Sequence, residues 1–369
     1  MAAFFADYAL FFLKVFTFVI AIIIVVFAVV MASGKGRSGR PQGELEVRHL
    51  NETLETMGES LKQTLMEPVA LKESLKKQKS EEKAKHKAAK KAAKLAAKAA
   101  KKQRGDGETV VAEEPRKKAV YVIDFDGDIR ASAVSSLRQE ITAVLTSATP
   151  TDEVVVKVES GGGMVTSYGL AASQLDRLRE QKIPLTICVD KVAASGGYMM
   201  ACVADKILAA RFAVVGSIGV VAQIPNIHRL LKQYNIDVEL LTAGKYKRTL
   251  TVLGENTEEG RQKFIEDIEK IHEQFKTYVQ EHRPQLDIDT VATGEVWSGD
   301  AAVEANLIDS ICTSDEYLVN ACKDADVYEV RYRVKKPLME KFGVGAQGVI
   351  DGVLFRWFDR LMRSRFDIG

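Results

Sequence analysis

Apolar and polar residues alternate in blocks along the middle of the chain, from residue 116 to about residue 337. Short runs rich in apolar and β-branched residues predict strands, and segments with apolar residues three and four positions apart predict helices. The predicted strands are Ala119–Phe125, Glu153–Val158, Ile183–Val189, Lys206–Ala209, Ala213–Val221 and Val238–Thr242. The predicted helices are Ser135–Ser147, Val165–Gln181, Tyr198–Val203, Ile224–Tyr234 and Thr257–Arg283. Strands that alternate with helices indicate a parallel sheet with helices on its faces, so we predict an α/β fold.

The N-terminal segment has a longer apolar run. Val15 to Ala32 carries no charge, and Thr17 is its only hydroxyl residue. Together with Leu10–Leu13, this run is long enough to span a bilayer. It is too long for the core of a cleaved signal peptide, and no basic segment precedes it. We therefore predict a transmembrane anchor over residues 1–34. The basic residues that follow it favour a cytoplasmic location for the rest of the chain.

Residues 35–115 are predicted to form a helical connector. Its apolar face, which packs on the globular domain or on a neighbouring chain, consists of Leu50, Leu54, Met57, Leu61 and Leu65. The net charge of the chain is only +2, but Lys83 to Arg104 holds ten Lys or Arg residues and no acid. This tract either attracts anionic lipid headgroups or forms a solvated spacer. It contains no aromatic residue for base stacking, which argues against nucleic-acid binding.

Two loops of small residues follow predicted strands. Val192–Cys202 contains Ser195 between a strand end and a helix start, where backbone N–H groups and the helix dipole can stabilise an oxyanion. A tight turn with a serine N-cap is the structural alternative. Ser160–Gly163 lacks the glycine spacing of nucleotide-binding loops but gives a ligand close access to backbone N–H groups. Because both loops follow strands of one parallel sheet, they are expected to converge at its carboxyl edge.

A nucleophilic serine needs a base. None of the five histidines lies in a loop suited to that role. Lysine serves as a base when desolvation lowers its pKa, and Lys245 and Lys247 follow the predicted strand Val238–Thr242. A basic, solvated turn is the alternative for these lysines. The four cysteines show neither a disulfide framework nor the spacing of a zinc site, so no metal or cofactor is predicted.

Taken together, these segments resemble the signal peptide peptidase A-like serine peptidases, and their SohB branch in particular. The resemblance extends from about Ala119 to Ile311. Its motifs, in order, are Ser160-Gly161-Gly162-Gly163, Ala194-Ser195-Gly196-Gly197-Tyr198, Gly216-Ser217-Ile218-Gly219-Val220, Gly244-Lys245-Tyr246-Lys247, and Gly294-Glu295-Val296-Trp297-Ser298-Gly299 with Asn306-Leu307-Ile308-Asp309. It implies a Clp protease/crotonase-like domain over residues 116–337, attached to the bacterial inner membrane by the N-terminal anchor.

The resemblance also implies the roles of individual residues. Ser195 matches the nucleophile, and Lys247 matches the general base, with Lys245 as the local rival. The N–H groups of Gly162 and Gly196 would bind the oxyanion, and Ser217 would support the lysine or line the substrate groove. Gly161 replaces the proline usual in the family, so the glycine loop should be more flexible. Peptides or unfolded membrane proteins are the expected substrates, and a homo-oligomer is the expected assembly.

The C-terminal residues 338–369 are predicted to contain a basic amphipathic helix that binds a membrane surface or a neighbouring subunit. Two other functions compete with a peptidase. One is a catalytically silent scaffold that tethers partners through the Lys-rich tract. The other is crotonase-type acyl-CoA chemistry on the same fold, which would need an acidic base. Glu159, which directly precedes the glycine loop, is the candidate for this base.

Overall fold

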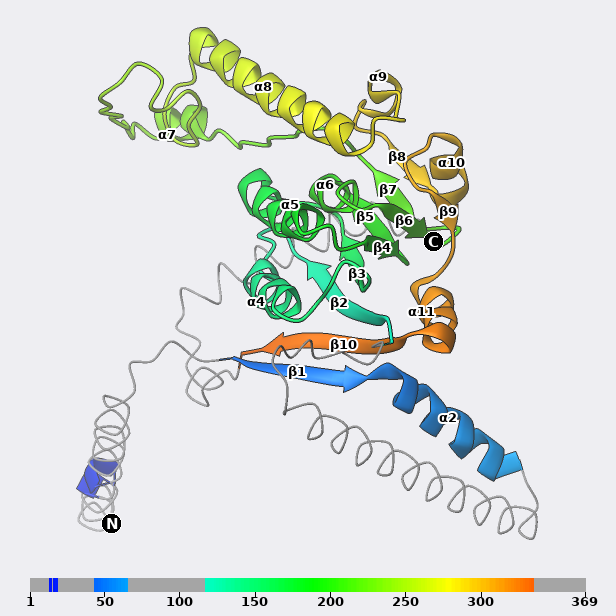
Figure 1. Ribbon diagram of the computed structural model, residues 1–369. Helices are drawn as coiled ribbons and strands as arrows, with labels where there is room; N and C mark the ends of the chain where they lie inside the picture. Colours follow the sequence, from blue (N-terminus) through cyan, green and yellow to red (C-terminus); the bar gives the residue numbers. More distant parts are fainter. Residues whose placement is uncertain (1–12, 15, 19–42, 66–116, 335–369) are drawn as a thin grey trace, which may run out of the picture. The chain divides into compact units, whose positions relative to one another are not determined.

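A computed structural model describes residues 13–14, 16–18, 43–65 and 117–334 (Figure 1). Nearly all of the predicted anchor, the whole Lys-rich tract and the C-terminal segment from residue 338 lie outside these residues. Within them, no helix has the length and apolar character that crossing a bilayer requires.

The described residues contain one ten-stranded sheet. The main path through the sheet is β1 (Glu44–His49), β10 (Asp326–Arg333), β2 (Ala119–Gly127), β3 (Glu153–Ser160), β4 (Leu185–Val189), β6 (Lys206–Ala209) and β9 (Ser310–Ile311). From β10 to β9, neighbouring strands on this path are parallel. A short branch, β5 (Val192–Ala194), pairs with β3 and with β7 (Val214–Gly216), and β8 (Val296–Ser298) runs antiparallel to β7.

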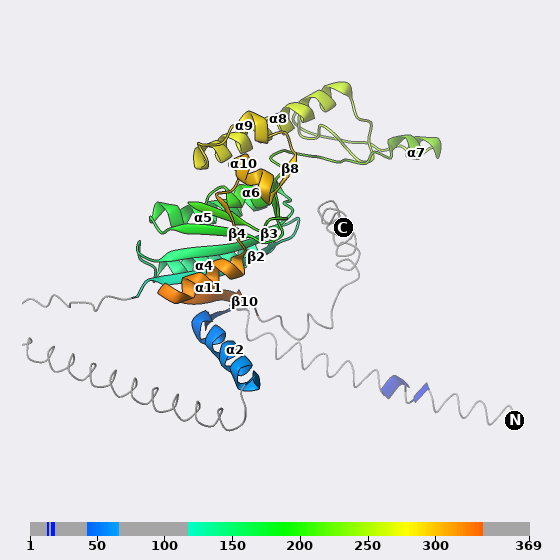
Figure 2. The same cartoon turned by 90° about the vertical axis from the view of Figure 1, so that its right-hand side faces the viewer.

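Helices cover the sheet because its strands alternate buried apolar side chains between two faces. The main core packs one face against α4 (Val134–Leu145), α5 (Val165–Glu180) and α6 (Gly196–Ala201). A smaller core packs the other face of the central strands against α11 (Ser314–Asp324). The remaining helices are α2 (Leu50–Leu65), α7 (His228–Gln233), α8 (Glu258–His282), α9 (Ile288–Val291) and α10 (Gly299–Glu304). Figures 1 and 2 show α8 and α11 on opposite sides of the central strands β3 and β4, with α11 beside β10.

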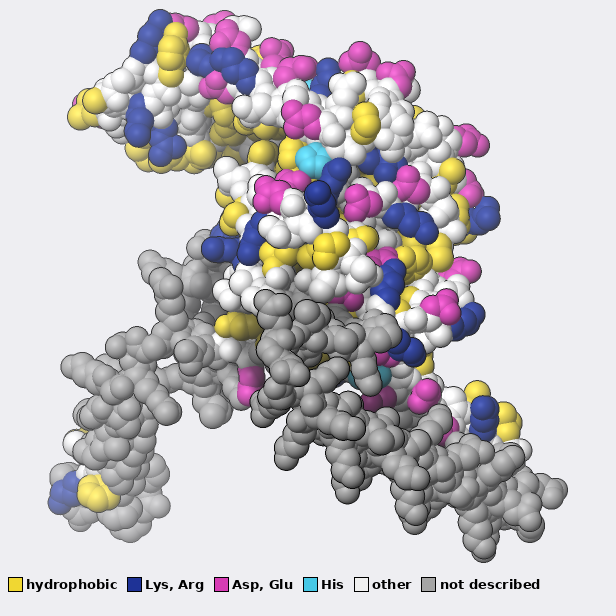
Figure 3. Space-filling view, viewed as in Figure 1, with side chains coloured by type: hydrophobic (Ala, Val, Ile, Leu, Met, Phe, Trp, Pro, Cys, Tyr) yellow, Lys and Arg dark blue, Asp and Glu magenta, His cyan; other side chains and the backbone are white. Residues whose placement is uncertain are grey.

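The α/β architecture and most of the predicted elements are confirmed. The main difference concerns residues 221–253, which we call the arm. The predicted strand Val238–Thr242 is wrong, and the predicted helix Ile224–Tyr234 is reduced to α7. Every residue of the arm is at least partly exposed, so its apolar residues have neither a neighbouring strand nor a core to pack against. Figure 3 shows apolar side chains gathered on the part of the surface that carries α7.

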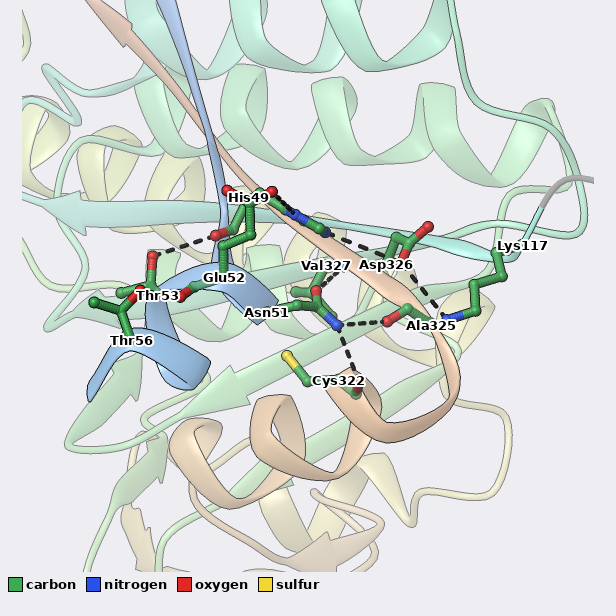
Figure 4. A network of polar contacts seen from close by, with 10 residues as sticks. All are labelled: His49, Asn51, Glu52, Thr53, Thr56, Lys117, Cys322, Ala325, Asp326 and Val327. Carbon is green, nitrogen blue, oxygen red and sulfur yellow. Dashed lines mark hydrogen bonds and ion pairs between the residues drawn. The ribbon is translucent and has the colours of Figure 1, made fainter. Parts of the chain in front are cut away.

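The described part of the predicted connector begins with a strand, β1, that lies beside β10 in the sheet. The following helix, α2, is fastened by Asn51 (Figure 4). The Asn51 side-chain amide donates to the carbonyls of Cys322 and Ala325, both at 3.0 Å, and its oxygen accepts from Val327 N–H at 2.8 Å. Residues 44–65 are therefore joined to the C-terminal edge of the globular unit by backbone pairing and by one asparagine.

Candidate active site

Strand pairing brings three of the sequence motifs to one edge of the sheet. Ser160, the last residue of β3, pairs with Ala193 of β5, and Ala194 pairs with Gly216 of β7. The chain continues from these positions into the glycine loop, into Ser195 and into Ser217. The Ser195 N–H donates to the Gly216 carbonyl at 2.8 Å, which ties the serine turn to the end of β7.

Ser195 has an unusual backbone conformation, with φ 53° and ψ −116°. Positive φ is disfavoured for a residue with a Cβ and costs on the order of 1–3 kcal/mol, so the surrounding packing must impose it. Ser195 occupies the N-cap position of α6, but its side chain forms no cap hydrogen bond. Its hydroxyl makes no hydrogen bond with any residue that the structure describes. The serine therefore does not serve as an ordinary N-cap.

The glycine loop contacts the Ser195 turn directly. Gly162 has φ +88°, and a Cβ added to it would lie 2.7 Å from Ser195 Cβ and 2.8 Å from Gly196 N. A side chain at residue 162 would therefore collide with the turn. Gly196 is the first residue of α6, where a helix leaves N–H groups without an intrahelical partner. The two glycines proposed as oxyanion donors thus both lie next to Ser195.

The Gly162 N–H is engaged in this structure. It donates to the Ser160 hydroxyl at 3.1 Å, and Ser160 lies 2.5 Å from the Tyr168 hydroxyl. Sequence reasoning selected neither the Ser160 side chain nor Tyr168. Tyr168 lies eight residues beyond Ser160, at an apolar position of the predicted helix, where it is indistinguishable from a core residue. The sequence held one hint of this contact, which is that a polar residue, Ser160, directly precedes the three glycines.

The two lysines differ in their surroundings. Lys245 forms an ion pair with Glu259 of α8 at 2.7 Å, and this hydrogen bond raises the pKa of the Lys245 ammonium. Lys247 is exposed on the arm, and its ammonium makes no hydrogen bond or ion pair with the described residues. A single copy of the chain therefore brings the glycine loop to Ser195 but joins neither lysine to it.

The remaining candidates are engaged elsewhere. The Ser217 hydroxyl donates to the Gly294 carbonyl at 3.4 Å and contacts neither lysine. His282 pairs with Asp176 at 2.8 Å, and His272 lies 3.2 Å from the Ile218 carbonyl. Glu159 forms an ion pair with Lys191 at 3.0 Å. Among the described residues, no cluster of His, Cys, Asp and Glu is arranged to hold a metal.

Comparison with known proteins shows the family of the chain. The models described as "Peptidase family S49 N-terminal" and "Peptidase family S49" match residues 3–175 and 177–328. A "Probable protease SohB" from Haemophilus influenzae is 54% identical over 258 residues, which are 70% of this chain and 72% of the relative. A "Probable protease SohB" from Buchnera aphidicola subsp. Schlechtendalia chinensis is 45% identical over 323 residues, which are 86% of this chain and 99% of the relative.

Among solved structures, a ClpP1 mutant from Listeria monocytogenes matches with a TM-score of 0.34 and 10% identity, covering 54% of this chain and 92% of that chain. The family models and the relatives show that the chain belongs to peptidase family S49. Within this family it is a SohB-type peptidase, so the resemblance that the sequence motifs indicated is confirmed.

Proposed function

We propose that this chain is a membrane-anchored serine endopeptidase with Ser195 as its nucleophile and Lys247 as its general base. The observation that carries the proposal is the geometry of Ser195. Its strained backbone places the hydroxyl at the N-terminus of α6 without a capping bond, while Gly162 lies in contact with the turn. A serine that only capped the helix would use its oxygen to accept a backbone N–H bond.

The proposed reaction has two halves. Neutral Lys247 takes the proton from the Ser195 hydroxyl as the oxygen attacks a peptide carbonyl, and the N–H groups of Gly162 and Gly196 stabilise the oxyanion. The Gly162 N–H exchanges its bond to Ser160 for one to the oxyanion. Lys247 then protonates the leaving amine and activates a water molecule that releases the acyl group. This mechanism uses no metal and no cofactor.

The surroundings of the two lysines support Lys247, and not Lys245, as the general base. The bond to Glu259 raises the pKa of Lys245 and disfavours its neutral form, whereas Lys247 has no such partner among the described residues. An exposed lysine still needs desolvation to act as a base. We therefore propose that copies of the chain associate through the apolar arm, where Val221 and Leu241 are 83% and 89% exposed. Association would bury Lys247 and bring one copy's lysine to a Ser195 hydroxyl.

The proposed substrates are peptides and unfolded or membrane-derived segments, including those that resemble signal peptides. An extended backbone is a suitable substrate because its carbonyl carbon is accessible to the serine and its oxygen can accept bonds from backbone N–H groups. The proposed location is the bacterial inner membrane, with residues 1–34 as a single-pass anchor. The apolar character of Val15–Ala32 supports this location.

A serine-reactive phosphonate probe tests the proposed nucleophile. The detergent-solubilised full chain should be inactivated and labelled at Ser195, and the Ser195→Ala variant should lose both labelling and cleavage of a fluorogenic peptide. Ser173→Ala is the matched control because Ser173 is an exposed serine of α5 that bonds only to its own helix. Cleavage that persists in Ser195→Ala at the parental rate overturns the proposal.

A further inference from the structure

A chain of buried hydrogen bonds lies beneath the glycine loop. Tyr168 is 0% exposed and Ser160 is 2% exposed, so water does not compete for their hydroxyls. The Tyr168 hydroxyl donates to the Asp128 carbonyl at 2.7 Å. The Ser160 hydroxyl lies 2.5 Å from the Tyr168 hydroxyl and 3.4 Å from the Gly127 carbonyl, so it can donate to either. Ser160 in turn accepts the Gly162 N–H at 3.1 Å. Two buried hydroxyls thus connect the Gly162 N–H to the carbonyls of Gly127 and Asp128 at the end of β2.

The ring of Tyr168 also supports the other proposed oxyanion donor. A Cβ added to Gly196 would lie 2.4 Å from Tyr168 Cγ, so the helix start rests directly on the ring. Phe125 packs edge-on against this ring, with centroids 6.3 Å apart at 73°. One side chain thus touches the Gly196 turn with its ring and holds Gly162 through its hydroxyl and Ser160.

The glycine loop needs such a tether. Gly161, Gly162 and Gly163 are consecutive, and glycine has the largest backbone freedom of any residue. Without the bond to Ser160, the Gly162 peptide would sample many orientations, and few of them would let its N–H turn from Ser160 to the oxyanion beside Ser195. A displacement of about 1 Å in a reacting geometry can cost on the order of 100-fold in rate.

We propose that Tyr168 is a positioning residue that, through Ser160, holds the Gly162 peptide beside Ser195 and Gly196. The inference rests on the proposed serine peptidase function. Tyr168 touches neither substrate nor nucleophile, so its effect is on the placement of the two backbone donors. Because these donors act most strongly on the transition state, the loss of the tether lowers kcat more than it changes KM.

The test compares single and double variants of the full chain in detergent. Tyr168→Phe removes one hydroxyl and leaves the ring under Gly196. We expect kcat for a fluorogenic peptide to fall about tenfold or more, with KM within about twofold. Ser160→Ala should have a similar effect. The double variant should be no slower than the slower single variant, because both hydroxyls are links in one chain.

Tyr198→Phe is the matched control. Tyr198 is equally buried, and its hydroxyl donates to the Leu307 carbonyl at 2.8 Å, away from the glycine loop. This variant should lose a comparable amount of thermal stability and keep its kcat. If Tyr168→Phe behaves in the same way, Tyr168 is merely structural and the inference is overturned. A rise in kcat for Ser160→Ala also overturns it, because Ser160 would then withhold the donor.

The Ser195→Ala variant separates the two proposals. If Ser195→Ala is inactive while Tyr168→Phe retains the parental kcat, only the positioning role fails. If Ser195→Ala cleaves at the parental rate, the serine peptidase mechanism fails and the positioning role fails with it.

Discussion

The residues around Ser195 are small because the backbone segments there touch one another. A Cβ on Gly162 would meet the Ser195 turn, and one on Gly196 would meet the Tyr168 ring. Ser195 itself adopts a φ that few residues with a Cβ adopt. The Ser195 turn, the glycine loop and the Tyr168 ring are thus packed so closely that a side chain at either glycine would force them apart.

Gly162→Ala tests this close packing. The added methyl would lie 2.7 Å from Ser195 Cβ, at a φ of +88° that disfavours alanine, so we expect peptide cleavage to fall by about 100-fold or more. Gly169→Ala is the control because a Cβ on this helical glycine meets nothing within 4 Å. That variant should keep its activity and gain roughly 0.5–1 kcal/mol in unfolding free energy. Unchanged cleavage by Gly162→Ala would contradict the proposed geometry.

Lys247→Ala and Lys245→Ala distinguish the two candidate bases. Lys247→Ala should abolish peptide cleavage, since no other lysine on this loop has its ammonium free of an acid in the described part of the chain. Lys245→Ala removes only the ion pair with exposed Glu259 and should reduce activity less than tenfold. Initial rates at saturating peptide measure both effects. Loss of cleavage in Lys245→Ala alone would reverse the assignment.

Among individual residues, the sequence pointed to Ser195 and the glycine loop as candidate site residues. Both follow buried strands, and the ends of these strands share one edge of a parallel sheet. It did not select Tyr168, because a tyrosine on an apolar helix face looks the same whether it fills a core or supports a loop. The bond from Gly162 to Ser160 also has no sequence signature, since it depends on the direction in which one peptide group points.

At the scale of elements, a polar cluster joins α8 to α5. His282 Nε2 lies 2.8 Å from one Asp176 carboxylate oxygen, and the Tyr278 hydroxyl donates to the other at 2.7 Å. The hydrogen bond to Asp176 raises the pKa of His282. Burial alone would raise the pKa of Asp176, but its bonds to His282 and Tyr278 outweigh this effect and lower it. The His282–Asp176 pair links the C-terminal end of α8 to α5, which belongs to the main core.

The stability contributed by this pair should depend on pH. A raised His282 pKa gives a contribution that is complete below about pH 6.5 and is lost as pH rises through the folded-state pKa. A lowered Asp176 pKa gives a contribution that is complete above about pH 4 and is lost as pH falls through its folded-state pKa. The difference in unfolding free energy between the parent and His282→Gln should thus be larger at pH 6 than at pH 9. Chemical denaturation at both pH values measures it, and equal differences would contradict the role of the pair.

Sequence periodicity predicted the helices and strands that pack on the hydrophobic core. It failed for segments that are exposed and have no core to pack against. Lys206–Ala209 was predicted with its observed bounds, because its apolar residues Ile207–Ala209 are buried in the sheet. Val238–Thr242 is also rich in apolar and β-branched residues, but it lies on the exposed arm and forms no strand. β1 was missed because Glu44–His49 is half exposed and takes its strand conformation from the neighbouring β10.

At the scale of the whole molecule, the arm exposes apolar surface that a single copy leaves in water. Such surface is typical of a protein–protein contact. We expect the detergent-solubilised full chain to have the mass of several copies and Leu241→Asp to shift it toward a single copy with loss of cleavage. Phe212→Asp is the control, since Phe212 is 87% exposed but lies outside the arm. Light scattering coupled to size-exclusion chromatography measures the mass, and a fully active single copy would contradict the proposed assembly.

The pairing of β10 with β2 has a consequence for biosynthesis. The strands that place Ser195 are β3, β5, β7 and β8, and all of them have been translated once the ribosome passes Ser298. The outer edge of β2 is covered only when β10, at Asp326–Arg333, has emerged. A nascent chain therefore contains every strand that positions Ser195 while β2 still presents an open row of N–H and C=O groups, which favours aggregation. A premature stop between these two points would yield a chain with all the strands that position Ser195 and an unprotected sheet edge.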